Sequence, residues 1–120
     1  MSDSLAELTL AIRRFADERD WEQFHSPKNL AMALIVEAGE LVEHFQWLSQ
    51  EESRHLDADR CCAVSLEMAD VLIYLLRLAD RMDIDLLEAA RRKLGINEQR
   101  YPAELARGRA DKYHRYRSDE

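Results

Sequence analysis

The chain contains 120 residues, of which 47% are hydrophobic, with only three glycines and two prolines. This length suits a single domain over residues 1–120, with a core from about 4 to 105, and the composition favours an all-α fold with long helices. The net charge of −7 excludes a uniformly basic surface, so a nucleic acid polymer is not an expected partner.

The first predicted helix lies near the N-terminus. Ser4 and Glu7 have the spacing of a capping box, and apolar residues then recur at helical intervals as far as Asp20. Residues 21–26 interrupt this periodicity. We therefore expect a helix followed by a short connection that contains aromatic residues.

Two longer helices are predicted in the middle of the chain. Ser26 followed by Pro27 is typical of a helix start, and the wide apolar stripe after it predicts a heavily buried helix over residues 27–48. A charged connection over residues 50–59 then leads to a helix over residues 60–82. The apolar stripes of these two helices are where a helical bundle would place its core.

A fourth, shorter helix is predicted towards the C-terminus. Asp85 and Glu88 have the spacing of an N-terminal cap, and Pro102 must end the helix that they begin. Residues 106–120 are polar and basic, so we expect a frayed tail there.

Other features bear on location and assembly. No basic segment followed by an apolar one opens the chain, and no uncharged apolar stretch is long enough to cross a bilayer. The adjacent Cys61 and Cys62 suit neither a structural disulfide nor a zinc site. We expect a reduced, cytoplasmic protein with no membrane partner. Residues 71–76 are apolar on every side of their helix, which indicates a homo-oligomer, either a dimer or a tetramer.

Two pairs of carboxylates are the main functional signal. Glu37 and Glu40 form one pair and Glu67 and Asp70 the other, each with the i,i+3 spacing of a helix. Other acid pairs in the chain have the same spacing, so spacing alone proves nothing. The neighbours distinguish these two pairs, because leucine, isoleucine and tyrosine side chains flank Glu37 and Asp70 at helical intervals.

These four acids are predicted to bind a metal ion and to be catalytic. Several buried carboxylates of like charge cost several kcal/mol each unless they are paired, and no lysine or arginine lies one helical turn away from any of them. All-carboxylate ligation suits a hard cation such as Mg²⁺ or Mn²⁺, which completes its shell with water and phosphate oxygens. The simpler alternative is that the four acids lie at the edges of the helices and reach solvent.

Aromatic and basic residues around these helices suggest a nucleotide. Aromatic faces sandwich a flat base well, while polar side chains recognise its edge and basic side chains neutralise its phosphates. The candidates for these roles are Trp21, His25, Trp47, Tyr74, Lys93, Asn97, Arg100 and Tyr101.

Two other classes of protein share some of these features. A di-iron carboxylate bundle would also place acids inside helices, but it usually takes two Glu-x-x-His motifs, and only Glu22 with His25 fits. A non-catalytic helical oligomerisation module would use the aromatic residues as a partner interface. In that case the acids would be dispensable for its activity.

Several segments together resemble the MazG-like, all-α nucleoside triphosphate pyrophosphohydrolases, most closely their dCTP pyrophosphatase branch. The similarity covers roughly residues 5–113. It is carried by Trp21-Glu22-Gln23-Phe24-His25, Glu37-Ala38-Gly39-Glu40-Leu41, Phe45-Gln46-Trp47, Glu67 with Asp70-Val71-Leu72-Ile73-Tyr74-Leu75, Ile96-Asn97 and Arg100-Tyr101-Pro102.

The resemblance implies a four-helix-bundle-like MazG-type domain that oligomerises through its long helices. It implies that Mg²⁺ is held by the four acids, and that Trp21, His25, Trp47 and Tyr74 form a base pocket, often completed across a subunit boundary, with Asn97 and Tyr101 nearby. The implied reaction is hydrolysis of dCTP or a modified cytosine nucleotide to the monophosphate and pyrophosphate, in nucleotide-pool house-cleaning. The short connection over residues 50–59 departs from the family and bears on base preference.

Overall fold

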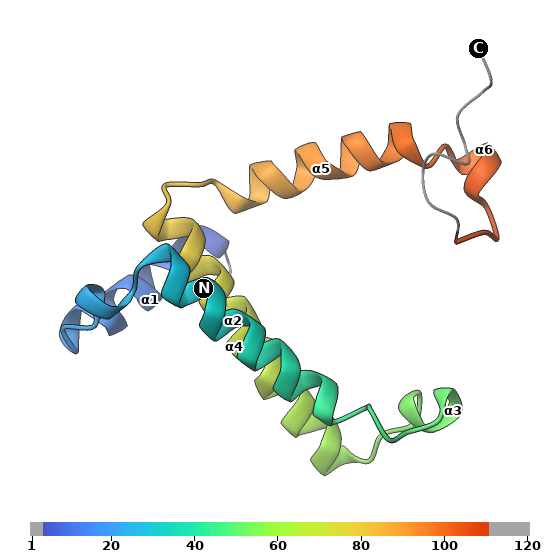
Figure 1. Cartoon of the computed structure of the whole chain (residues 1–120), viewed down its shortest axis with the longest axis horizontal. Helices are drawn as coiled ribbons and strands as arrows, with labels where there is room; N and C mark the ends of the chain where they lie inside the picture. The colour runs from blue at the N-terminus through green and yellow to red at the C-terminus, as the bar shows by residue number, and fades with distance from the viewer. Residues whose placement is uncertain (1–3, 111–120) are drawn as a thin grey trace. The chain divides into compact units, whose positions relative to one another are not determined.

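The computed structural model describes residues 4–110, and these contain helices and no strand (Figure 1). The all-α prediction is therefore confirmed. In chain order the elements are α1 (Leu5–Glu18), the 3₁₀ helix η1 (Glu22–Phe24), α2 (Pro27–Glu43), α3 (Gln50–Ser53), α4 (Ala58–Arg81), α5 (Leu86–Arg100) and α6 (Ala103–Ala106).

The contacts divide the chain into two compact units, Met1–Ile84 and Asp85–Glu120. Each unit has its own helices, so each is described by itself. The single domain over residues 1–120 stays a prediction. Of the predicted C-terminal tail, the part beyond position 110 lies outside the described residues.

Side-chain caps begin the long helices where the sequence predicts them. The Ser4 hydroxyl accepts the N–H of Glu7 at 3.1 Å and so begins α1. The Ser26 hydroxyl accepts the N–H of Asn29 at the same distance and begins α2, with a proline at the first helical position. An equivalent aspartate cap at Asp85 begins α5. The four long helices expected from the sequence are therefore present.

Two aspartates in the left-handed region end α1 and α4. Asp20 and Asp83 both have a φ of 55°, a conformation that aspartate tolerates better than most residues other than glycine. Beyond Asp20, the N–H of Trp21 donates to the carbonyl of Ala16 at 3.0 Å, which closes the helix end. The first helix thus ends at Glu18, two residues before the predicted boundary.

The connection between α2 and α4 differs most from its prediction. Helix α2 ends at Glu43, not at position 48, because hydrogen bonds between residues three apart replace the helical pattern; one joins the Phe45 N–H to the Val42 carbonyl at 2.9 Å. The expected loop contains α3, which a reciprocal capping box between Ser49 and Glu52 begins.

In the first unit, α4 is the central helix. It packs along α2, which runs antiparallel to it, and it also contacts α1 (Figure 1). The side chains that become buried are Ala16, Leu30, Val64, Leu76, Arg77 and Ala79.

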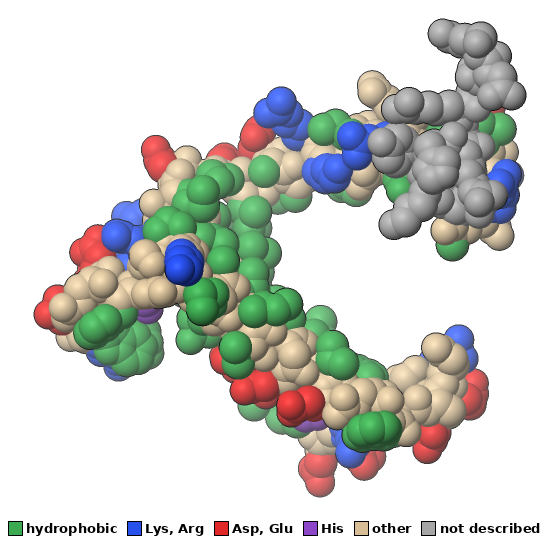
Figure 2. Space-filling model, in the orientation of Figure 1, with side chains coloured by type: hydrophobic (Ala, Val, Ile, Leu, Met, Phe, Trp, Pro, Cys, Tyr) green, Lys and Arg blue, Asp and Glu red, His purple; other side chains and the backbone are tan. Residues whose placement is uncertain are grey.

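Much apolar surface of α2 and α4 stays exposed. Ile35 on α2 is 68% exposed and Leu66 on α4 is 63% exposed. Figure 2 shows hydrophobic side chains along both helices, with acidic side chains beside them. Isolated exposed leucines are ordinary in proteins, whereas larger apolar patches mark interaction sites. Assembly of this chain stays a prediction.

The second unit contains α5 and α6. Helix α5 ends at Arg100, and Pro102 follows immediately, as the sequence predicts. Pro102 then precedes the short α6, which lies in a segment where no helix was expected. None of the helices in the part of the chain that the structure describes combines the length and the apolar character needed to cross a membrane.

The small core makes Leu30 a sensitive test of this packing. Leu30 is 1% exposed, so Leu30→Ala should remove a well-packed side chain and lower the free energy of unfolding by about 2–5 kcal/mol. The matched variant Leu10→Ala, at a position that is 50% exposed on α1, should cost clearly less. Urea unfolding followed by circular dichroism measures both, and equal losses would contradict the packing described here.

Candidate functional site

Three carboxylates from two helices meet in the structure. Glu37 on α2 and Glu67 and Asp70 on α4 each offer one oxygen, and these oxygens all lie within 4.8 Å of one another. The packing of α2 against α4 brings the two acidic motifs together. Glu40, the fourth predicted ligand, is not a member of this group, although its carboxyl group influences that of Glu37.

Part of this acidic group is withdrawn from solvent. The Oε2 atoms of Glu37 and Glu67 are inaccessible to water, and neither has a hydrogen-bond partner among the residues that the structure describes. A buried polar atom without a partner costs about 1–3 kcal/mol. A cation at these oxygens would remove that cost.

The electrostatics of the group also favour a cation. The pKa of Glu37 is raised to about 7, mainly by burial and also by a hydrogen bond with Glu40 and the negative charges of Glu40, Asp70 and Glu67. A positive ion would favour the ionised carboxylate and oppose this shift. The group contains neither histidine nor cysteine, so its donors fit a hard divalent cation.

A second group of predicted site residues precedes α2. The rings of Trp21 and His25 meet edge to face, with centroids 6.2 Å apart. The ring of Phe15 on α1 also meets that of Trp21 edge to face, with centroids 5.6 Å apart. Trp21 nevertheless stays 42% exposed, so aromatic surface is available to a ligand here.

The charged residues that hold His25 were missed in the sequence. On α4, Arg77 donates from Nε to the ring nitrogen Nδ1 of His25, and Arg81 donates from Nε to the backbone carbonyl of His25, both at 3.1 Å. Arg77 also contacts Asp80 at 3.4 Å, and Arg13 on α1 binds the Asp80 carboxylate through two nitrogens at 2.9 and 2.6 Å. A lone arginine inside an apolar helical run was the signal that could have found this network.

The structure does not bring the two predicted tryptophans together within one chain. Trp47 lies in the turns after α2 and is 87% exposed. The whole of α2 separates it from Trp21 and His25, and a helix of 17 residues is about 25 Å long. Tyr74 is half-buried on α4, one helical turn beyond Asp70. A single chain therefore cannot place both tryptophans against one base.

The remaining predicted residues lie in the second unit. Lys93, Asn97 and Arg100 recur on one side of α5 at helical spacing. Tyr101 follows the helix, and its N–H donates to the carbonyl of Asn97 at 2.7 Å. Their contribution to a substrate site stays a prediction.

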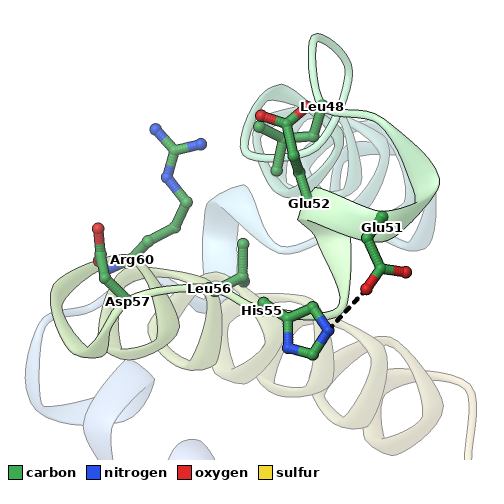
Figure 3. Close-up of a pocket in the computed structure, with 7 residues that line it drawn as sticks. All are labelled: Leu48, Glu51, Glu52, His55, Leu56, Asp57 and Arg60. Carbon is green, nitrogen blue, oxygen red and sulfur yellow. Dashed lines mark hydrogen bonds and ion pairs between the residues drawn. The ribbon is translucent and has the colours of Figure 1, made fainter.

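A separate pocket lies at the connection between α2 and α4 (Figure 3). Its volume is about 410 Å³. In Figure 3 the dashed line joins His55 Nε2 to Glu51 Oε1, which are 3.0 Å apart. The lining residues are Leu48, Glu51, Glu52, His55, Leu56, Asp57 and Arg60, and none of them is a predicted site residue.

The acidic group predicts an unusual titration. Without a divalent cation, Glu37 should lose its proton near pH 7, well above the pKa of an ordinary glutamate. The folded state then keeps this proton to a higher pH than the unfolded state does, so the free energy of unfolding should fall as the pH rises from about 4.5 to 7. Carbon-13 NMR of the carboxyl group measures this pKa. Glu67→Gln, which removes a neighbouring charge, should lower it.

The matched control for this titration is Glu43→Gln. Glu43 ends α2 and is not among the groups that raise the pKa of Glu37. This variant should leave the Glu37 midpoint unchanged. A midpoint near that of a free glutamate in the unmodified chain would contradict the burial described above.

Comparison with known proteins places the chain in a family. The pattern of the MazG-like family matches residues 32–115. The chain is 50% identical over 101 residues to dCTP pyrophosphatase 1 of Mus musculus and to that of Homo sapiens, which covers 82% of this chain. It spans about 59% of the length of these curated relatives.

A solved structure supports the same relationship. A pyrophosphatase from Archaeoglobus fulgidus DSM 4304 superposes with a TM-score of 0.79 and 43% sequence identity. The match covers 85% of this chain and 95% of the archaeal chain. These similarities in sequence and fold show that the chain belongs to the MazG-like family.

Proposed function

We propose that this protein hydrolyses a nucleoside triphosphate, dCTP or a related cytosine nucleotide, to the monophosphate and pyrophosphate in the presence of Mg²⁺. The observation that carries the proposal is the convergence of Glu37, Glu67 and Asp70, with two carboxylate oxygens buried and unpartnered. The names of the relatives support the reaction class, since they are dCTP pyrophosphatases and a pyrophosphatase.

In this proposal the three converging acids hold the divalent cation. When bound, such a cation neutralises charge on phosphate oxygens and makes a nearby water easier to deprotonate. Glu37 must be ionised to act as a ligand, and the positive charge favours that state. Mn²⁺, which accepts the same oxygen ligands, should substitute for Mg²⁺.

Glu40 has a different part in the reaction. It is half-buried on α2 one helical turn from Glu37 and lies outside the converging group, so in this proposal it does not bind the cation. We assign to Glu40 the role of orienting the attacking water and accepting its proton. Cleavage of the bond between the α and β phosphates then requires no nucleophilic side chain.

The base of the nucleotide is bound by the aromatic residues that precede α2. Trp21 and His25 contact it. Because about 25 Å of helix separates these aromatic residues from Trp47, a second copy of the chain supplies the other side of the pocket. The exposed apolar surface of α2 and α4 supports this assembly as a dimer or tetramer.

Removal of the converging carboxylates should abolish turnover. Glu37→Gln and Glu67→Gln each keep the side-chain volume but remove a cation ligand, and we expect kcat for dCTP to fall at least about a hundredfold. Glu43→Gln, at the exposed end of α2, should keep ordinary activity. Hydrolysis that survives unchanged in both ligand variants would contradict a cation held by these acids. An unmodified chain that does not hydrolyse dCTP would favour the non-catalytic helical module.

The products identify the bond that is cleaved. With dCTP and Mg²⁺, pyrophosphate and dCMP should form in equal amounts. An excess of chelator should stop the reaction, because the buried oxygens of Glu37 and Glu67 have no hydrogen-bond partner among the described residues that could replace the cation. Phosphorus NMR follows both products. Orthophosphate as the sole primary product would contradict the proposed cleavage.

A further inference from the structure

Arg77 is the one charged side chain among the buried residues of the described chain. It is only 3% exposed, although it lies in an otherwise apolar stretch of α4. A buried charge costs several kcal/mol unless it has good partners, so an unpaired arginine at this position would destabilise the fold. The partners that Arg77 has are therefore informative about its purpose.

Those partners occupy two different edges of the guanidinium group. Arg77 reaches Asp80 through NH1 at 3.4 Å, which supplies a counter-charge on the same helix. The Nε atom instead donates to Nδ1 of His25, at 3.1 Å, and this residue lies 52 positions earlier in the chain. Arg13 fixes Asp80 in turn through two short contacts. Arg13 on α1 and Asp80 on α4 thus hold the guanidinium group of Arg77 in contact with the His25 ring.

In the hydrogen bond between Arg77 and His25, only Arg77 can be the donor. An arginine side chain carries donors and no acceptor, so Nδ1 of His25 must accept and cannot carry a proton. In a neutral imidazole the proton then belongs to Nε2. The geometry of a single hydrogen bond therefore selects one of the two tautomers.

The backbone of His25 is held as firmly as its ring. Arg81 donates to the carbonyl of His25 at 3.1 Å and pairs with Glu22 of η1 through NH1 at 2.5 Å. The ring of Trp21 meets the imidazole edge to face. Nε2 of His25 has no hydrogen-bond partner among the residues that the structure describes. The one free polar atom of this ring is therefore a donor.

We propose that Arg77 is a positioning residue that locks His25 in the Nε2–H tautomer, so that His25 offers a hydrogen-bond donor to the ligand beside Trp21. The inference rests on the proposed function for the identity of that ligand. The atom that His25 meets must then be an acceptor, either a ring carbonyl oxygen or an unprotonated ring nitrogen of a nucleobase. An exocyclic amino group cannot take that place, since it is itself a donor.

The charges around His25 agree with a neutral ring. Burial lowers the pKa of His25, and the positive charges of Arg77 and Arg81 on α4 lower it further. The facing acids, Asp80 on α4 and Glu22 in η1, are themselves paired with arginines. The ring should therefore stay neutral to a lower pH than an ordinary histidine, and the donor should persist through the physiological range.

The test uses the full chain labelled with nitrogen-15 in histidine. Long-range proton–nitrogen NMR separates a protonated ring nitrogen from an unprotonated one, and His25→Gln identifies the His25 signals among those of the four histidines. In the unmodified chain we expect His25 to show an unprotonated Nδ1 and a protonated Nε2, with a pKa below that of an ordinary histidine. A protonated Nδ1, or a rapid mixture of both tautomers, would overturn the proposal.

Two arginine variants separate hydrogen bonding from charge. Arg77→Met keeps an unbranched side chain in the buried position but removes the donor, and it should give a mixture of tautomers and a higher pKa for His25. Arg81→Met removes a nearby positive charge without touching the ring bond, so the pKa should rise while the tautomer stays the same. An unchanged tautomer in Arg77→Met would contradict a positioning role.

Steady-state kinetics with dCTP test whether the tautomer of His25 affects binding of the ligand. Loss of one oriented donor should raise KM for dCTP about five- to tenfold in Arg77→Met and change kcat little. The NMR result is independent of turnover. A chain that holds the tautomer but hydrolyses nothing would refute the proposed function alone, whereas an active chain with a mixed tautomer would refute this inference alone.

Discussion

The packing of α2 against α4, which forms the centre of the first unit, brings like-charged carboxylates together. Glu37 faces Glu67 and Asp70 across the helix pair, and two of their oxygens are out of reach of water without a hydrogen-bond partner. The pair of helices would be more stable with apolar residues at these positions. This loss of stability is expected of a functional site, and a bound cation, as we propose, would offset it.

The same helix pair also leaves its surroundings incomplete. Few side chains of the first unit are buried, while Ile35, Leu66 and other apolar residues of α2 and α4 are largely exposed. The two predicted tryptophans lie beyond opposite ends of α2, so the aromatic residues of one chain do not enclose a base. The homo-oligomer that we propose would account for both features at once, because it would cover the apolar surface and bring Trp47 of one copy towards Trp21 of another.

Much of the fold could be predicted because its signals are local. Serine and aspartate caps, the proline after Ser26 and the helical recurrence of apolar residues depend on short stretches of sequence, and the structure has the corresponding long helices. The end of α2 and the presence of α3 were not foreseen. Tight turns between residues three apart and a capping box compete with continuation of a helix, and periodicity does not distinguish these outcomes.

The site could be predicted only as far as its residues share a helix face. The apolar neighbours of Glu37 and Asp70 pointed to a buried acidic group, and the structure brings Glu37, Glu67 and Asp70 within a few ångströms. The contact between Arg77 and His25 joins residues 52 positions apart, so it depends on tertiary packing that no local pattern encodes. For the same reason the sequence could not separate Glu40 from the three converging acids.

The most direct test of the account is the position of a bound Mn²⁺ ion in crystals of the protein. Anomalous scattering from manganese should give a peak within coordination distance of Glu37, Glu67 and Asp70, about 2.0–2.2 Å from carboxylate oxygens. The buried Oε2 atoms of the two glutamates should then have their missing partner. A manganese peak elsewhere, or carboxylates paired instead with basic side chains of a second copy, would contradict a cation site between α2 and α4.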